Sequence, residues 1–479
     1  MSLELFLVGL VAVPLGFAAL RQWKLLIWAV MFLFVFEGAI RKWLLPGLQA
    51  QVYLFKDALL MLAYVGFIFH GPPRRWTPAH QKTVRFLMSL CVLYYLIEIF
   101  NPNSPSFLLS IAGFKNYVLY FPLAFAVAHM FTSRQDLEMK IRRYAWVMIP
   151  VGVLGLVQFS LGPAHWLNAY VAHEEGTVTI VSQFGGGIER ARTAGTFSYL
   201  SGYVTFLTAM IFLSLGLIIG NGVRLRGNVP IFALMMFSIA AMFTTGSRMG
   251  VLSVAVAPPA VLLVALYRGD ISASVAFRSI FVFVSVTVAV LIAAPDAFDA
   301  FVNRTNRVED GATRFLAPLV ETWGAMEIAP ILGTGLASTH GGLVRALVDA
   351  NSDFYWLNDN LFELESARIV QETGVIGFLL NYVLRFFCTL LAMRLAFSFR
   401  DRTFSALSAG LACFFALHMI LYLVGNPTAA IFYWFGVGLL FAMWHLEQES
   451  VAPKRLDGAI NIFPYARRPG SGHAAYPVH

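Results

Sequence analysis

Apolar residues occur along this chain in long runs separated by short polar connections. Most runs approach the roughly 20 residues that an α-helix needs to cross the hydrocarbon core of a bilayer. They lack the alternation over about 10 residues that is typical of transmembrane β-strands. About thirteen helices are predicted, over residues 3–20, 25–40, 52–69, 86–100, 114–131, 144–161, 198–219, 229–245, 250–267, 279–295, 372–393, 404–424 and 428–446.

The composition supports a lipid environment for these helices. Hydrophobic residues make up 58% of the 479 residues and charged residues only 13%, whereas soluble domains carry roughly 25% charged residues. We therefore expect an all-α fold, a polytopic transmembrane helix bundle of about 12–13 spans over residues 1–446. The Pro-, Gly- and Arg-rich segment 447–479 is expected to be a disordered cytoplasmic tail.

The distribution of Lys and Arg predicts the orientation of the bundle, because cytoplasmic loops carry an excess of both. Basic connections recur on one side, for example at residues 74–85 and 134–143. The opposite, periplasmic side then holds the segment 162–197 and one large loop, 296–371. The aromatic content of that large loop argues against disorder. It contains helix-like stretches around residues 313–328 and 360–371.

The net charge and the cysteines exclude several other classes of protein. The net charge of +8 does not indicate a nucleic-acid partner, because the basic residues are scattered through short loops. It fits contact with the lipid bilayer and with anionic substrates. Cys91, Cys388 and Cys413 lie inside apolar runs and are expected to be small buried hydrophobic side chains, with no disulfide or metal framework.

Several basic residues lie on the side that orientation disfavours, among them Arg41, Arg192, Arg248 and Arg314. Charged side chains at membrane depth are costly and usually face a cavity or a partner. Several guanidinium groups at one interface suit a phosphate or diphosphate, which they bind in bidentate fashion. Two simpler interpretations remain open, since Arg41 can pair with Glu37 four residues earlier and Arg248 can extend to the lipid headgroups.

An acidic cluster precedes the predicted span 372–393. Helical spacing places Glu365, Arg368 and Glu372 on one face, with Glu363 on the opposite side. A carboxylate here would serve as a general base on a sugar hydroxyl, and the loop residue His340 is a further candidate for that role. The alternatives are an ion-paired stripe on an interfacial helix, a helix cap for Glu363 and an incidental loop histidine.

The order of three motifs resembles the O-antigen ligase and Wzy-type polysaccharide polymerase superfamily. The first motif is Arg192-Thr-Ala-Gly-Thr-Phe, leading into a span, and the second is Thr-Gly-Ser-Arg248 between two spans. The third is a large late periplasmic loop that begins near Arg314 and ends in Gln-Glu372-Thr-Gly-Val-Ile-Gly. The resemblance covers roughly residues 140–446 in architecture.

The resemblance implies a substrate and the role of several residues. Family members act at the periplasmic face of the bacterial inner membrane on glycans carried by a polyprenyl diphosphate, and they need no nucleotide sugar, metal or other cofactor for the transfer. Arg192, Arg248 and Arg314 would bind the lipid diphosphate, which is also the leaving group. Ligase-like members carry a His-Asn pair where this chain has Glu363 and Leu364, so the base stays open between Glu363, Glu365 and His340.

Together these observations predict a periplasm-facing glycosyltransferase that polymerises lipid-linked repeat units of an exopolysaccharide or O-antigen. Polysaccharide assembly and export proteins are expected partners. The first alternative is a ligase that transfers a finished glycan to a lipid core or a protein. The second is a polysaccharide or lipid transporter, a class that commonly shows inverted repeats and broken midplane helices; no such repeat is visible in the sequence.

Overall fold

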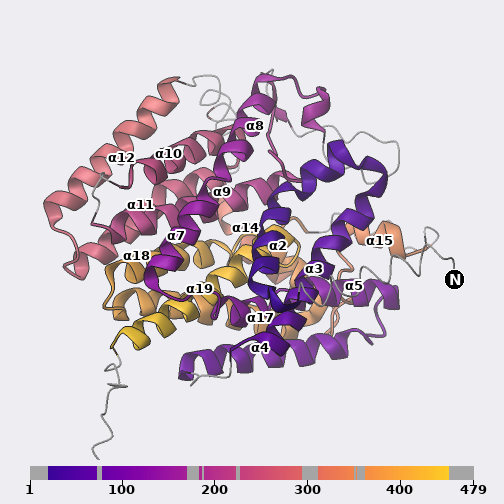
Figure 1. Cartoon of the computed structure of the whole chain (residues 1–479). Helices are drawn as coiled ribbons and strands as arrows, with labels where there is room; N and C mark the ends of the chain where they lie inside the picture. Colours follow the sequence, from indigo (N-terminus) through magenta and orange to yellow (C-terminus); the bar gives the residue numbers. More distant parts are fainter. Residues whose placement is uncertain are drawn as a thin grey trace, which may run out of the picture.

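The computed structural model describes residues 20–72, 78–169, 183–185, 188–222, 227–293, 311–349 and 362–451, together with residues 302 and 352. Of the predicted first helix, residues 3–20, only residue 20 belongs to the described part of the chain. The described helices (Figure 1) are α2 Trp23–Ala39, α3 Gln49–His70, α4 Ala79–Glu98, α5 Phe107–Val118, α6 Leu123–Val127, α7 Arg134–Ala145, α8 Met148–Ser160, α9 Leu200–Gly220, α10 Val229–Thr244, α11 Arg248–Tyr267, α12 Ala273–Ala293, α14 Gly311–Ile328, α15 Gly341–Leu347, α17 Glu365–Ser398, α18 Arg402–Leu417 and α19 Pro427–Val451.

Eight stretches of these helices are long and apolar enough to cross a membrane, and the chain is therefore a multi-pass membrane protein with an all-α bundle. They are Trp23–Leu44, Pro46–His70, Phe107–Val127, Arg134–Ser160, Leu200–Gly220, Arg248–Tyr267, Glu365–Ser398 and Pro427–Ser450. Helices α10, α18 and the Ala273–Ala289 part of α12 are apolar but shorter. The finer count of about 12–13 spans includes these three helices, α4 and the predicted helix over residues 3–20, and it stays a prediction.

Helix α9 forms the centre of the bundle. Every residue from Gly202 to Gly220 is buried, as expected for a helix that is apolar on all sides. Helix α18 packs closely along it, because a Cβ atom at Gly216 would lie only 2.8 Å from the Cα atom of Leu407. Small residues allow such close approach of helices in membranes, where packing replaces the hydrophobic driving force.

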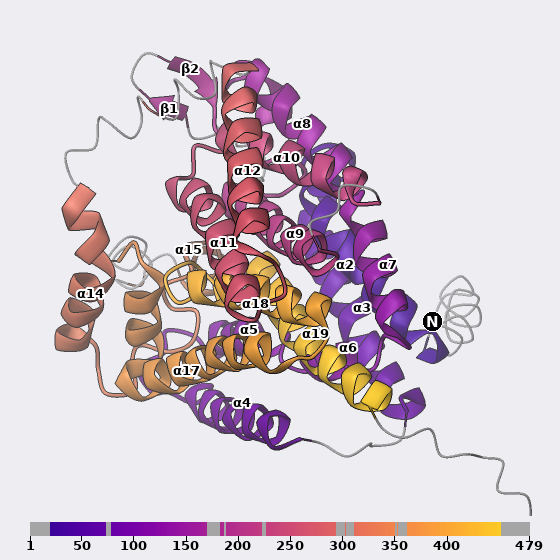
Figure 2. The same cartoon turned by 90° about the vertical axis from the view of Figure 1, so that its left-hand side faces the viewer.

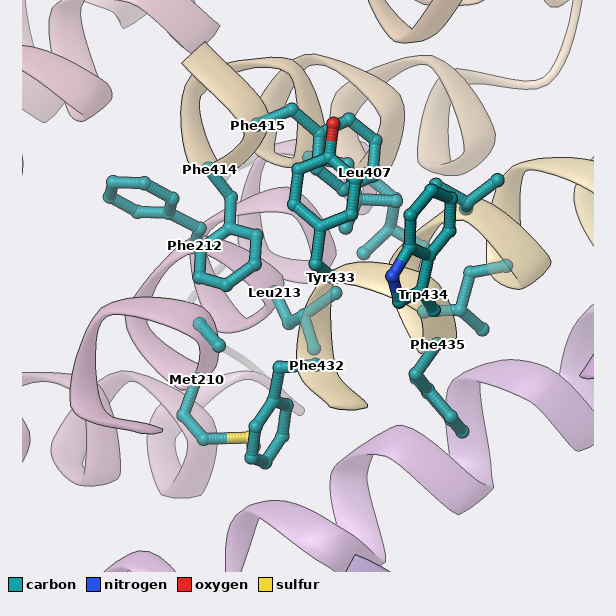
Figure 3. Packing of buried hydrophobic residues seen from close by; sticks show 14 of the residues in the cluster. Met210, Phe212, Leu213, Leu407, Phe414, Phe415, Phe432, Tyr433, Trp434 and Phe435 are labelled. Carbon is teal, nitrogen blue, oxygen red and sulfur yellow. The ribbon is translucent and has the colours of Figure 1, made fainter. Parts of the chain in front are cut away.

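Helices α18 and α19 complete this core on one side of α9. Figure 3 shows the aromatic rings of α18 and α19 filling the space beside α9. Tyr433 lies 4.5 Å from Phe415 between ring centroids and 5.1 Å from Trp434. The tilted and edge-to-face geometry of these pairs is the favourable one for aromatic side chains. The labelled residues of the cluster are Met210, Phe212, Leu213, Leu407, Phe414, Phe415, Phe432, Tyr433, Trp434 and Phe435.

The two segments expected to be periplasmic contain regular structure. Segment 162–197 includes the short antiparallel pair β1 (Gln183–Gly185) and β2 (Ile188–Ala191). Segment 296–371 includes α14, α15 and the first turns of α17. Figure 2 shows α14 at the edge of the molecule beside α17, and the contact is formed by Ala325, Ala367 and Val370. Their location on the periplasmic side stays a prediction.

Helix α17 begins at Glu365 and joins the helix-like stretch expected around residues 360–371 to the span expected from residue 372, with a break at Gly374. The end of the last helix differs from the sequence-based expectation. Helix α19 continues to Val451, so residues 447–451 belong to a helix and not to the tail. Glu447 stabilises this extension, since its carboxylate accepts hydrogen bonds from the backbone N–H groups of Arg400 and Asp401.

Candidate functional site

A pocket of about 220 Å³ that contains several polar and charged side chains lies where several helices begin. The N-terminal ends of α9, α17 and α19 reach it, and α5 and the turn before α15 complete its wall. Helix N-termini carry partial positive charge from their unpaired N–H groups, so their convergence favours an anion. The pocket is lined by Asn116, Tyr117, Ser201, Ala337, Thr339, His340, Glu365, Arg368, Ile369, Glu372, Tyr422, Val424, Gly425 and Asn426.

The predicted face of α17 lines this pocket. Glu365, Arg368 and Glu372 all contribute to its wall, as the helical spacing of the sequence indicated. The two carboxylates are buried, with exposed fractions of 3% and 5%. Buried carboxylates are stable only when donors surround them, so their partners decide what each one does.

Glu365 is fully engaged in holding the structure. Its Oε2 atom lies 2.8 Å from Nη1 of Arg385, a side chain that is itself buried in the bundle. Its Oε1 atom accepts backbone N–H groups from Leu423, Val424 and Gly425 at 2.6–3.1 Å. With these donors around both of its oxygens, Glu365 fixes the loop before α19.

Glu372 holds the opposite wall of the pocket. It accepts hydrogen bonds from the Tyr117 hydroxyl at 2.8 Å, from the backbone N–H of Ala337 at 3.1 Å and from both the N–H and the hydroxyl of Thr339. Ala337 adopts φ +61°, a conformation that costs a non-glycine residue free energy and persists only where its surroundings impose it. The carboxylate of Glu372 supplies that constraint and thereby positions His340, which follows Thr339.

Two glycines allow the turn before α15 to approach α17. Gly374 interrupts α17 with φ +64°, and Gly333 has φ +69°. Thr334 and Gly335 donate their N–H groups to the carbonyls of Gln371 and Glu372, at 2.7 and 3.0 Å. A Cβ atom at Gly374 would collide with the Ile331 carbonyl oxygen. Gly333 and Gly374 are therefore needed for the close packing of these two backbone segments.

His340 is the titratable side chain of the pocket whose ring nitrogens remain available to a ligand. It is half-buried, and its imidazole makes no hydrogen bond to the described residues. Burial lowers its pKa, the charge of Glu372 raises the pKa in part, and Arg368 lowers it again, with a net shift below the ordinary value. The imidazole is therefore neutral near pH 7, which is the form that accepts a proton.

Arg368 is the cation of the pocket. Its Nε atom donates to the Phe362 carbonyl at 2.9 Å and its Nη1 atom to the Thr339 carbonyl at 3.3 Å. The guanidinium also lies over the ring of Tyr422, 5.7 Å from its centroid. No carboxylate forms an ion pair with it among the described residues, so its positive charge remains for a bound anion.

Glu363, a candidate base in the sequence, lies outside the pocket. Its side chain is exposed, and its backbone groups form hydrogen bonds with neighbouring side chains. The N–H donates to a carboxylate oxygen of Glu321 at 3.0 Å, and the carbonyl accepts the hydroxyl of Tyr422. Asn360, the expected capping partner of Glu363, falls outside the described residues.

Three of the arginines proposed from the sequence to bind a diphosphate, Arg41, Arg192 and Arg248, do not line this pocket. Arg192 and Arg248 are brought near each other, because Thr193 pairs with Thr244 through its backbone N–H at 3.2 Å and through its hydroxyl at 2.8 Å. The Nε atom of Arg192 donates to the Thr245 carbonyl at 3.1 Å. Arg248 begins α11 and is half-buried.

The other two arginines lie elsewhere. Arg41 forms the ion pair with Glu37 that the sequence left open, at 2.7 Å, and it also donates to the hydroxyl of Ser198. Arg314 belongs to α14, and its side chain lies outside the described part of the structure. The structure thus places Arg192 against the turn that leads into Arg248, and neither residue lines the pocket that contains Arg368.

Several pocket residues were not singled out in the sequence. Asn116 and Tyr117 come from α5, and Tyr422 and Asn426 from the connection between α18 and α19. The polar pair Asn116-Tyr117 follows Lys115 inside an apolar run, and that interruption was the available signal. Within the described residues, no group of three His, Cys, Asp or Glu side chains is arranged to hold a metal ion.

Comparison with known proteins gave no match to any protein-family model or to any curated sequence. The functional interpretation therefore depends on the pocket itself.

Proposed function

We propose that this protein is an inner-membrane glycosyltransferase that polymerises glycan repeat units carried on a polyprenyl diphosphate at the periplasmic face. One observation carries the proposal. A single pocket, where three helices begin, contains both His340 and Arg368, and Arg368 has no acidic partner among the described residues. A base next to an anion-binding group is what transfer from a diphosphate to a hydroxyl requires.

In the proposed reaction, His340 removes the proton of the acceptor hydroxyl. The hydroxyl oxygen attacks the anomeric carbon of the donor sugar and forms the new glycosidic bond. The bond from that carbon to the diphosphate oxygen breaks, and the lipid diphosphate leaves with the electron pair. Arg368 and the N-termini of α9, α17 and α19 stabilise the departing negative charge. Glu372 acts as a positioning residue through Thr339.

The missing histidine of the ligase-like pattern has a counterpart in this arrangement. The resemblance places an imidazole at the position of Glu363, whose side chain is exposed and does not line the pocket. His340 brings an imidazole to the pocket from a different segment of the chain. The proposal therefore assigns the role of the base to His340 and not to Glu363 or Glu365.

A reconstituted transfer assay tests this proposal. The purified full chain in liposomes would receive a polyprenyl diphosphate that carries one repeat unit, and the products would be separated by size. We expect the wild type to form a ladder of polymers and both His340→Ala and Arg368→Gln to form none. Lys140→Gln, which removes an ion pair with Asp136 on α7, serves as the control. Wild-type rates in both pocket variants would refute the proposal.

A further inference from the structure

A second cationic group lies beside the pocket, around the aromatic ring of Tyr53. The Nζ atoms of Lys56 and Lys115 lie 3.3 and 4.5 Å from the ring centroid, and the guanidinium carbon of Arg41 lies 5.3 Å away. These three cations come from different elements, α3, α5 and the π-helical turn Ile40–Leu44 after α2. We call them the Tyr53 cluster.

The acidic residues of the cluster do not balance its positive charge. Glu37 lies between Arg41 and Lys56, at 2.7 and 3.0 Å, and Asp57 pairs with Lys115 at 2.6 Å. No other carboxylate forms an ion pair with these cations in the part of the chain that the structure describes. Three cations therefore face two carboxylates, and one positive charge is left over.

An excess charge here is costly, because the cluster is buried within spans of a membrane protein. Lys56 is fully buried, and Glu37 and Asp57 are buried as well. Uncompensated charges at such sites destabilise a protein and usually mark a functional site. A bound anion would compensate the charge, and cation clusters of this kind are suited to phosphate groups.

The cluster borders the catalytic pocket at two points. Lys115 immediately precedes Asn116 and Tyr117, both of which line the pocket. Arg41 donates to the hydroxyl of Ser198, one turn before the pocket residue Ser201. The side chains of Lys115 and Arg41 retain 25% and 15% exposure, so a ligand can reach them from outside the bundle.

We infer that the Tyr53 cluster binds the diphosphate of a second polyprenyl-linked glycan, the acceptor of the transfer. The inference rests on the proposed function and deepens it. Arg368 holds the diphosphate that leaves with the donor lipid. Polymerisation needs a second lipid-linked glycan whose diphosphate stays intact, and a separate cationic site beside the pocket anchors it. A ligase acceptor without a diphosphate has no use for such a site.

Substitution of Arg41 provides a mild test, because Glu37 keeps Lys56 as its partner when Arg41 is replaced. Arg41→Gln removes the surplus charge and leaves two cations facing two carboxylates. Arg41→Lys keeps the charge and is the matched rescue variant. Lys140→Gln changes a cation elsewhere and serves as the general control. Thermal unfolding of each variant would report on folding.

The measurement is the number of polyprenyl diphosphate molecules, without sugar, bound to the full chain in native mass spectrometry. We expect two in the wild type, in Arg41→Lys and in Lys140→Gln. In Arg41→Gln the second molecule should bind about tenfold more weakly or worse. A second series of measurements adds an excess of phosphatidylglycerol, which tests whether the cluster binds a phospholipid headgroup instead. We expect that neither polyprenyl diphosphate molecule is displaced.

The outcomes separate this inference from the proposed function. Two tightly bound molecules in Arg41→Gln, or displacement of the second one by phosphatidylglycerol, would overturn the acceptor site while leaving transfer by His340 intact. A wild type that binds one molecule, lost in Arg368→Gln, would also overturn it. A wild type that binds none would overturn the acceptor site and the proposed function together.

Discussion

Two pairs of residues, Glu365 with Arg385 and His340 with Arg368, contrast in how their polar groups are satisfied. Glu365 and Arg385 form a buried ion pair, and Glu365 accepts three further backbone N–H groups. His340 and Arg368 border the same pocket without a hydrogen bond to the imidazole or an acidic partner for the guanidinium among the described residues. A charge at membrane depth therefore marks a functional site only when its partners leave capacity for a ligand.

The largest effect is expected when the satisfied pair is broken. Arg385→Met leaves the buried carboxylate of Glu365 without its cation, which should lower the free energy of unfolding by about 3–5 kcal/mol. Denaturant unfolding in detergent measures the loss. The double variant Glu365→Gln with Arg385→Met removes the unpaired charge and should regain part of the stability. A single variant as stable as the wild type would show that the pair has no structural role.

The next largest effect concerns the unsatisfied pair. His340→Ala should reduce the transfer rate by about 10²–10⁴-fold, the usual contribution of a general base, with no matching loss of stability. The pKa of His340 lies below its ordinary value. Wild-type activity should therefore persist as the pH falls through the usual imidazole range and decline only when the imidazole becomes protonated.

The pH profile of the variant is the control for this role. A residual activity in His340→Ala that still declines over the same acidic range would assign that titration to another group. If His340 had only a structural role, its replacement would lower stability but leave the acidic decline of activity in place. The pH profile therefore distinguishes a structural role from the role of the base.

Sequence reasoning predicted the parts of the site that depend on local spacing. Glu365, Arg368 and Glu372 lie on one face because helical periodicity places them there, and the pocket confirms it. Cys91 and Cys388 are buried, as their apolar context indicated, whereas Cys413 is only half-buried. Helical periodicity holds within one element and carries no information about which other element packs against that face.

The parts that the sequence did not predict depend on contacts between distant segments. Glu365 meets Arg385, twenty residues later, because Gly374 breaks α17 between them and lets its two halves fold toward each other. Tyr117 reaches Glu372 from a helix more than two hundred residues earlier. Charge and orientation alone grouped Arg192 and Arg248 with Arg314, whereas the structure makes Arg368 the cation of the pocket.

A smaller effect is expected at the break in α17, between Glu365 and Arg385. Gly374→Ala places a Cβ atom against the Ile331 carbonyl at φ +64° and should destabilise the protein by about 1–3 kcal/mol. Gly222→Ala is the matched control, because Gly222 has φ +73° and no atom lies within 4 Å of the new Cβ. Equal losses in the two variants would mean that only the left-handed conformation matters and that the contact with Ile331 relaxes.

The smallest effect is expected at Glu363, which the sequence offered as a base beside Glu365 and His340. Its exposed side chain does not line the pocket, and surface substitutions usually change free energies by less than about 0.5 kcal/mol. Glu363→Gln should therefore keep the transfer rate within about twofold of the wild type. A loss comparable to that of His340→Ala would return the role of the base to Glu363. It would also mean that Glu363 comes to line the pocket when substrate binds, since its side chain is exposed and outside the pocket lining in the free protein.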